Sequence, residues 1–199
     1  MYDPQTVIDQ VRRWVEAVVV GLNLCPFASD PLARGKVRIV CSRAQDPGEL
    51  LAELLHEIDL LEEGDQAETT LLAAPDLLRD FDDFLDVLGV AEALLVERGM
   101  DGRYQLAHFH PDYRFEGLPE GDPAHLAHCA PHPVLHILRW DDVRQAMQTH
   151  PNVAQIPIDN QDRLRAMGTL AVQALLDLTR THSETIEIRT RSEEQQDPS

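Results

Sequence analysis

The sequence contains one lysine, three cysteines and no long apolar segment, and each scarcity excludes a class of protein. No glycine-rich phosphate loop precedes Lys36, so we discount Schiff-base and Walker-type lysine chemistry. Cys25, Cys41 and Cys129 lie far apart without Cys-x-x-Cys spacing, which predicts reduced thiols in a cytoplasmic protein rather than a disulfide framework. The apolar runs are far shorter than the roughly 18 residues of a membrane span. No basic segment precedes an apolar one at the N-terminus, so we also expect no secretory signal.

Positive charge is scarce as well, because 17 Lys and Arg residues face 35 Asp and Glu residues and give a formal net charge of −18. A field of this sign repels phosphate backbones and anionic lipids, so we expect neither a nucleic acid nor a membrane as partner. The segment 46–97 holds sixteen acidic residues and one basic residue, whereas the segment 98–150 holds seven acidic residues, five basic residues and seven histidines. The second segment is nearly neutral, so a small and even anionic substrate fits there.

The pattern of apolar residues predicts a single α/β domain over residues 1–181 and a polar, flexible tail over 182–199. Apolar and β-branched runs predict strands at 37–42, 69–74, 103–110 and 133–139. Helical periodicity and Asp-Pro caps predict helices starting at Pro4 and Pro47, and others at 76–98, 141–149 and 159–181. Helices between strands predict a two-layer or three-layer α/β domain with a four-stranded, mainly parallel sheet, whose fourth strand is antiparallel.

Side chains that can bind a metal or transfer protons are most concentrated at and after the end of the third predicted strand. This is the sheet edge where α/β proteins bind ligands. Side chains alternate along a strand, so His108 and His110 share a face, and an antiparallel fourth strand beside the third would bring His136 toward them. We therefore predict that His108, His110 and His136 hold a divalent transition metal such as zinc. The alternative is that these imidazoles are hydrogen-bonded core or loop residues. The long loop 111–132 adds side chains whose membership of the site stays open: His125, His128, Cys129 and His132.

A second constellation surrounds Cys25 in the segment 22–28, LNLCPFA. Its Cys-Pro-Phe-Ala run is superficially similar to a glutaredoxin site that has lost its second cysteine. Cys25 follows a predicted helix and meets the negative end of its dipole, which favours a buried, structural thiol. The functional alternative is a Cys25 nucleophile with His110 as base and Asp112 orienting the imidazole, although Asp112 also suits a turn. The acidic run 80–86, DFDDFLD, predicts a solvated helix start rather than a catalytic carboxylate pair.

Four segments carry a resemblance to a known family: GLNLCPFA at 21–28, DFLDV at 83–87, FHPDYRFEG at 109–117 and PHPVLHILR at 131–139. Over about residues 5–170 the chain resembles a bacterial, mostly proteobacterial, family of uncharacterised proteins that is known only as a domain of unknown function. Members of this family usually have other residue types where this chain has His125, His128, Cys129 and His132. The resemblance supplies no reaction, but it directs attention to a smaller set of residues: His110, Asp112, His136 and Arg139.

Two functional hypotheses follow from these patterns. In the first, the protein is a metal-dependent or Cys/His-assisted, hydrolase-like enzyme with its site under the loop 111–132. Its catalytic residues would be His110, Asp112, His136 and Cys25, and a small, anionic substrate would meet Arg139, Tyr113 and Arg114. In the second, the protein is a non-catalytic binding or accessory protein that uses the same loop as a recognition surface. A shared pocket for His110, Asp112 and His136 would favour the enzyme, and scattered imidazoles would favour the binding protein.

Overall fold

A computed structural model describes residues 2–64 and 66–181, and a four-stranded sheet forms its centre. The predicted flexible tail at 182–199 lies outside the described residues. The sheet has the order β1-β2-β4-β3 and consists of β1 (Val37–Cys41), β2 (Thr69–Ala73), β3 (Tyr104–Phe109) and β4 (Val134–Arg139). All four predicted strands are therefore present.

The sheet is mixed, and the prediction of a mainly parallel sheet is wrong. β1 and β2 pair in parallel, whereas β4 pairs antiparallel with both β2 and β3. Strands β1, β2 and β3 do point the same way, but β4 inserts between β2 and β3. Burial explains this order, because Val134, Leu135 and Ile137 of β4 are almost fully buried and require a central position, whereas most of β3 is only half-buried and lies at an edge.

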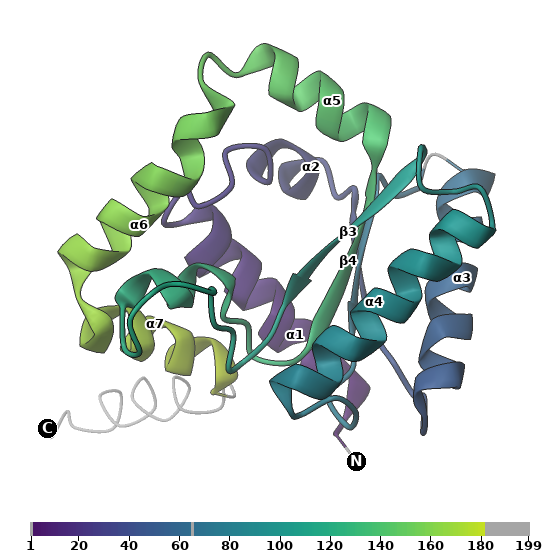
Figure 1. Ribbon diagram of the computed structural model, residues 1–199, viewed down its shortest axis with the longest axis horizontal. Helices are drawn as coiled ribbons and strands as arrows, with labels where there is room; N and C mark the ends of the chain where they lie inside the picture. Colours follow the sequence, from purple (N-terminus) through teal and green to yellow (C-terminus); the bar gives the residue numbers. More distant parts are fainter. Residues whose placement is uncertain (1, 65, 182–199) are drawn as a thin grey trace, which may run out of the picture.

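Helices cover both faces of the sheet and give three layers (Figure 1). One face packs against α1 (Pro4–Trp14), with α7 (Thr169–Arg180) beside it, and the other face packs against α3 (Pro47–Glu63) and α4 (Phe81–Glu97). Asp3, Asp46 and Asp80 cap α1, α3 and α4 by accepting backbone N–H groups of the first turn, as the Asp-Pro patterns predict for the first two.

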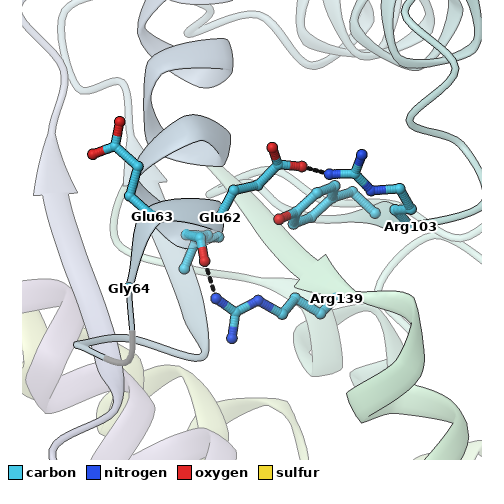
Figure 2. Close-up of a pocket in the computed structure, with 7 residues that line it drawn as sticks. Glu62, Glu63, Gly64, Arg103 and Arg139 are labelled. Atoms are coloured by element: carbon cyan, nitrogen blue, oxygen red, sulfur yellow. Dashed lines mark hydrogen bonds and ion pairs between the residues drawn. The ribbon is translucent and has the colours of Figure 1, made fainter.

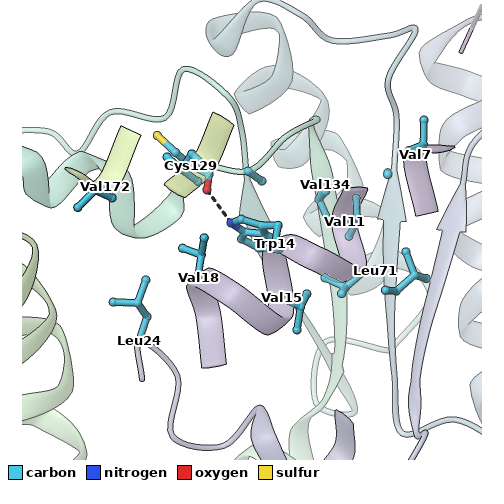
Figure 3. Packing of buried hydrophobic residues seen from close by; sticks show 14 of the residues in the cluster. Val7, Val11, Trp14, Val15, Val18, Leu24, Leu71, Cys129, Val134 and Val172 are labelled. Carbon is cyan, nitrogen blue, oxygen red and sulfur yellow. Dashed lines mark hydrogen bonds between the residues drawn. The ribbon is translucent and has the colours of Figure 1, made fainter. Parts of the chain in front are cut away.

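Each face of the sheet has its own hydrophobic core because side chains alternate along every strand. Leu71 and Val134 pack toward α1, where Trp14 anchors the cluster and donates its indole N–H to the Cys129 carbonyl at 2.8 Å (Figure 3). Leu72 and Leu135, one residue further along their strands, pack toward α3 and α4. The sheet therefore separates the two cores, and a side chain's position along a strand decides which core it joins.

Shorter elements complete the described fold: the π-helix η1 (Val15–Val20), α2 (Ser29–Ala33), the 3-10 helices η2 (Pro123–His128) and η3 (Val153–Gln155), α5 (Trp140–Thr149) and α6 (Ile156–Met167). The helix predicted at 159–181 is two helices, because Gly168 adopts φ of 80° between α6 and α7. None of the described helices has the length and apolarity needed to cross a membrane.

Candidate functional site

The carboxyl ends of three strands lie together at one edge of the sheet, as the sequence predicts. Cys41, Ala73 and Phe109 lie at the carboxyl ends of β1, β2 and β3, and the register aligns them with Val134 at the start of β4. His110 follows directly at this edge. It lies on the α4 side together with His108, since the ring of Phe84 is 5.3 Å from the ring of His110 and 6.2 Å from that of His108. The predicted shared face of His108 and His110 is confirmed.

His110 is fully buried and both of its ring nitrogens are occupied. Nδ1 accepts the backbone N–H of Asp112 at 3.1 Å, so Nε2 carries the ring proton and donates it to the Leu78 carbonyl at 3.0 Å. Leu78 has a φ of 57°, a left-handed conformation that is costly for a leucine. The rings of Phe81 and Phe84 lie 5.3 Å from the His110 ring. His110 therefore holds a strained turn before α4.

His136 lies on the opposite face of the sheet, so the expected meeting of three imidazoles is wrong. His136 pairs with Leu71 of β2 and with Ala107 of β3, whereas His108 pairs with Leu135. Thr69 donates its hydroxyl to the Ile137 carbonyl at 2.6 Å and accepts Nε2–H of His136 at 2.7 Å. Burial lowers the pKa of His136 to about 4, which keeps the imidazole neutral.

The zinc site predicted on His108, His110 and His136 consequently does not form. Over residues 2–64 and 66–181, no three His, Cys, Asp or Glu side chains are grouped in a way that could hold a metal ion. The spacing of the histidines along the chain suggested this site. In the structure, however, the antiparallel register pairs His136 with Ala107, one residue before His108. Neighbouring residues of a strand point to opposite faces of the sheet, so His136 and His108 lie on different faces.

Two of the loop histidines fix the loop 111–132. His125 accepts the Phe115 N–H at Nδ1 and donates from Nε2 to the Pro119 carbonyl, each at 3.0 Å. His132 is buried, and its Nε2 donates to the Gln10 side chain at 2.6 Å. Burial and the nearby Arg180 lower the pKa of His132 to about 4. Both imidazoles therefore act as structural links.

His108 of the edge strand β3 forms a cluster with Tyr113 and His128 of the loop, which the sequence did not indicate as a unit. The Tyr113 hydroxyl lies 3.3 Å from Nε2 of His108, and the rings of Tyr113 and His128 are 4.7 Å apart. Burial lowers the pKa of His108, and burial together with the neighbouring His108 lowers that of His128 to about 4. Nδ1 of His128 is buried without a hydrogen-bond partner in the described structure. No local spacing indicates this cluster, because His128 reaches His108 and Tyr113 only through the folding of the loop.

Asp112 and Arg114 are exposed on the loop on either side of half-buried Tyr113. Asp112 reaches His110 through its backbone N–H, so the observed contact does not involve its carboxylate. The four aspartates of the run 80–86 are exposed as well, which agrees with a solvated helix start.

Leu22 and Leu24, just before Cys25, pack in the core on the α1 side of the sheet, whereas the ring neighbours of His110 come from α4 on the other side. The π-helix η1 leads into the cysteine segment through Gly21, where a Cβ would lie 2.3 Å from the Ala17 carbonyl oxygen. Asn160 and Arg163 of α6 bind the Leu24 and Leu22 carbonyls, each at 2.7 Å. Burial raises the pKa of the half-buried Cys25 thiol, more than the backbone N–H groups of Phe27 and Ala28 lower it. The Cys25–His110 pair therefore does not form.

Arg139 lies at the other end of the sheet from His110, because the register pairs it with Tyr104 at the start of β3. It also occupies the α4 face of β4, opposite to His136, as strand alternation predicts. Its guanidinium donates to the Leu61 carbonyl near the end of α3. It lines a hollow of about 680 Å³ together with Arg103 and Tyr104 (Figure 2). Arg139 therefore does not share a site with the loop histidines.

The described chain thus combines a mixed sheet, a strained cysteine segment on one side and a loop fixed by histidines on the other. A family model described as "Protein of unknown function (DUF1415)" matches residues 6–174, which reach from α1 into α7. No curated protein and no solved structure matches the chain. The match spans most of the chain and includes both the Cys-Pro-Phe and the Phe-His-Pro-Asp-Tyr segments, so the protein belongs to the DUF1415 family of unknown function.

Proposed function

We propose that the protein is a non-catalytic binding protein and that the loop 111–132 is its recognition surface. The observation that supports this proposal most directly is the state of His110, whose two ring nitrogens are both used in hydrogen bonds and whose ring is fully buried. A general base or a metal ligand needs a nitrogen that reaches its reacting partner. His136 lies on the other face of the sheet, and Cys25 follows Leu24, which packs in the core on that same side, so the predicted catalytic residues are scattered.

The loop is fixed at several points along its length, which suits recognition better than the movement of a lid. The backbone of His110 pairs with residues 128 and 130, and Trp14 donates to the Cys129 carbonyl. Arg165 of α6 binds the Asp122 carboxylate at 2.8 Å. A loop that is already ordered loses little conformational entropy when it binds a partner.

The outer side of this loop carries polar and charged groups around an aromatic centre. Tyr113 and Phe115 are half-buried with ring centroids 4.9 Å apart, and the exposed Asp112, Arg114 and Glu116 alternate with them. An aromatic centre with a polar rim is the usual composition of a recognition surface.

An enzymatic function is the second candidate, and one observation favours it. His108 and His128 are neighbouring imidazoles with lowered pKa values, and Nδ1 of His128 is buried without a described partner. Neutral imidazoles beside the Tyr113 hydroxyl have the composition of an acid–base site.

Hydrolysis of p-nitrophenyl acetate by purified protein separates the two candidates. Under the binding proposal, any hydrolysis by the parent protein should be unchanged in His108→Gln and in His128→Gln. Turnover that falls at least tenfold in either variant, with the fold intact by circular dichroism, would establish the enzymatic candidate instead.

Site-specific photo-crosslinking provides the positive test of the recognition surface. A crosslinker at position 114 should capture a partner that a crosslinker at exposed position 144 of α5 does not capture. Binding of that identified partner to purified protein should weaken at least tenfold in Arg114→Glu, the change expected for loss of one charged contact. Equal capture from both positions, or unchanged affinity of the Arg114→Glu variant, contradicts the proposal.

A further inference from the structure

The hollow at the sheet edge opposite His110 is an open surface depression of about 680 Å³. Leu61 and Glu62 of α3, Tyr104 of β3 and Arg139 of β4 contribute to its wall. The site is independent of the loop 111–132, because Arg139 and Phe109 lie at opposite ends of the β3–β4 pair.

The two arginines of this hollow differ in how their charges are compensated. Arg103 forms an ion pair with Glu62, and its guanidinium lies 5.9 Å from the centre of the Tyr104 ring. Arg139 donates to the Leu61 carbonyl, an uncharged group, and this is the one polar contact of its guanidinium in the described part of the chain. Figure 2 shows the Glu63 carboxylate pointing away from Arg139. The full positive charge of Arg139 is therefore not neutralised by a carboxylate of the described residues.

Arg139 also has a structural role, because Leu61 lies in the last turn of α3. A cation that binds a terminal carbonyl stabilises the helix end and its dipole. This role uses one N–H of a guanidinium that carries five, and the remaining donors keep the planar geometry that binds a carboxylate through two parallel hydrogen bonds.

We propose that this hollow binds the carboxylate of a small organic acid, with Arg139 as the anion-binding residue. A singly charged anion suits the site, because the one uncompensated positive charge among the described lining residues is the single charge of Arg139. Glu62 pairs with Arg103, and Glu63 points away from Arg139. The Arg103–Glu62 pair fixes one wall beside Tyr104.

The test is a nuclear magnetic resonance titration of ¹⁵N-labelled protein with acetate and, separately, with inorganic phosphate at constant ionic strength. Acetate should give saturable shifts at Gly64, Tyr104 and the Arg139 side chain, and phosphate should bind more weakly. Arg139→Gln should weaken acetate binding at least tenfold, as expected for a lost charged hydrogen bond. Arg144→Gln is the matched control, since Arg144 is exposed and paired with Asp141 outside the hollow, and it should bind acetate like the parent.

Arg139→Lys keeps the positive charge and one donor for the Leu61 carbonyl but removes the planar fork, so it tests the proposal even if Arg139→Gln folds poorly. We expect this variant to remain folded and to bind acetate several-fold more weakly. The proposal is overturned if acetate gives no saturable shift, if phosphate binds more tightly than acetate, or if the folded Arg139→Lys variant binds acetate as well as the parent.

Discussion

At the scale of single residues, the imidazoles of this protein serve mainly as hydrogen-bonding links between segments. His110 joins β3 to the turn before α4, His125 closes the loop, and His132 joins the loop to α1. A neutral imidazole is well suited to this task because one nitrogen donates and the other accepts. The dense histidines between residues 108 and 136 therefore reflect the needs of a long irregular loop that crosses several elements.

Replacing His110 by alanine should lower the free energy of unfolding by about 2–4 kcal/mol. The change leaves a cavity beside Phe81 and Phe84 and removes the donor from the Leu78 carbonyl. Urea denaturation at pH 7.5 measures the loss, and His56→Ala is the control, because His56 is exposed and its replacement should change the stability by less than about 0.5 kcal/mol. A loss below about 1 kcal/mol for His110→Ala would contradict the linking role.

The shared face of His108 and His110 was predictable from sequence because it depends only on the two-residue period of a strand. The position of His136 was not, because it depends on the register between β3 and β4. The two strands are joined by an irregular loop that contacts α1 and α6, and no local pattern encodes the register between them. Long-range packing also placed Leu24, just before Cys25, on the opposite side of the sheet from the ring neighbours of His110.

At the scale of elements, the π-helix η1 and the segment after it depart from regular α-helical geometry. Gly21 donates its N–H to the Glu16 carbonyl, and Asn23 adopts a φ of 49°. The side chains of Asn160 and Arg163 bind the carbonyls that this conformation exposes. The irregular geometry thus fixes the path of the chain into Cys25 and joins it to α6.

Two glycine substitutions should change stability in opposite directions. Gly21→Ala would place Cβ 2.3 Å from the Ala17 carbonyl oxygen and should destabilise the protein by about 1–3 kcal/mol. Gly89→Ala, in the middle of α4 where a Cβ meets nothing within 4 Å, should stabilise it by up to about 1 kcal/mol. Thermal unfolding of both variants beside the parent measures the pair. Equal effects of the two substitutions would show that the close contact at Gly21 is relieved without cost.

The starts of α1 and α3 and the positions of the strands were predictable because Asp-Pro caps and apolar periods are local signals. The helix predicted from residue 76 instead begins at Phe81, because Asp80 rather than Asp76 is its cap. The order of the strands was not predictable, because burial on both faces of Val134–Arg139 selects the central position only once all four strands compete for it. The break at Gly168 was also missed, since the apolar pattern continues across it while its φ of 80° ends α6.

At the scale of the whole molecule, the acidic residues and the histidines respond to different ranges of pH. Carboxyl groups with ordinary pKa values near 4 keep the net charge strongly negative above about pH 5. Acidification below that range relieves the repulsion within a chain of formal charge −18. Imidazoles with ordinary pKa values near 6.5 bind protons earlier. The interval between about pH 6.5 and pH 5 therefore reports mainly on the histidines.

Stability should fall as the pH decreases from about 6.5 to 5. The pKa values of His128, His132 and His136 are lowered to about 4 in the folded protein, whereas an unfolded histidine titrates near 6.5. Between these values the unfolded chain binds more protons than the folded chain, so protonation favours unfolding, and each imidazole contributes on the order of 1–3 kcal/mol over the full interval.

Urea denaturation at several pH values between 7.5 and 5 measures this dependence, and His136→Gln provides the specific test. Glutamine keeps a donor for Thr69 but takes up no proton, so the variant should lose stability less steeply with decreasing pH than the parent does. Exposed His56→Gln should leave the slope unchanged. An unchanged slope in His136→Gln would mean that the imidazole gains a proton without leaving its place beside Thr69, and the neutral state assigned to it would be wrong.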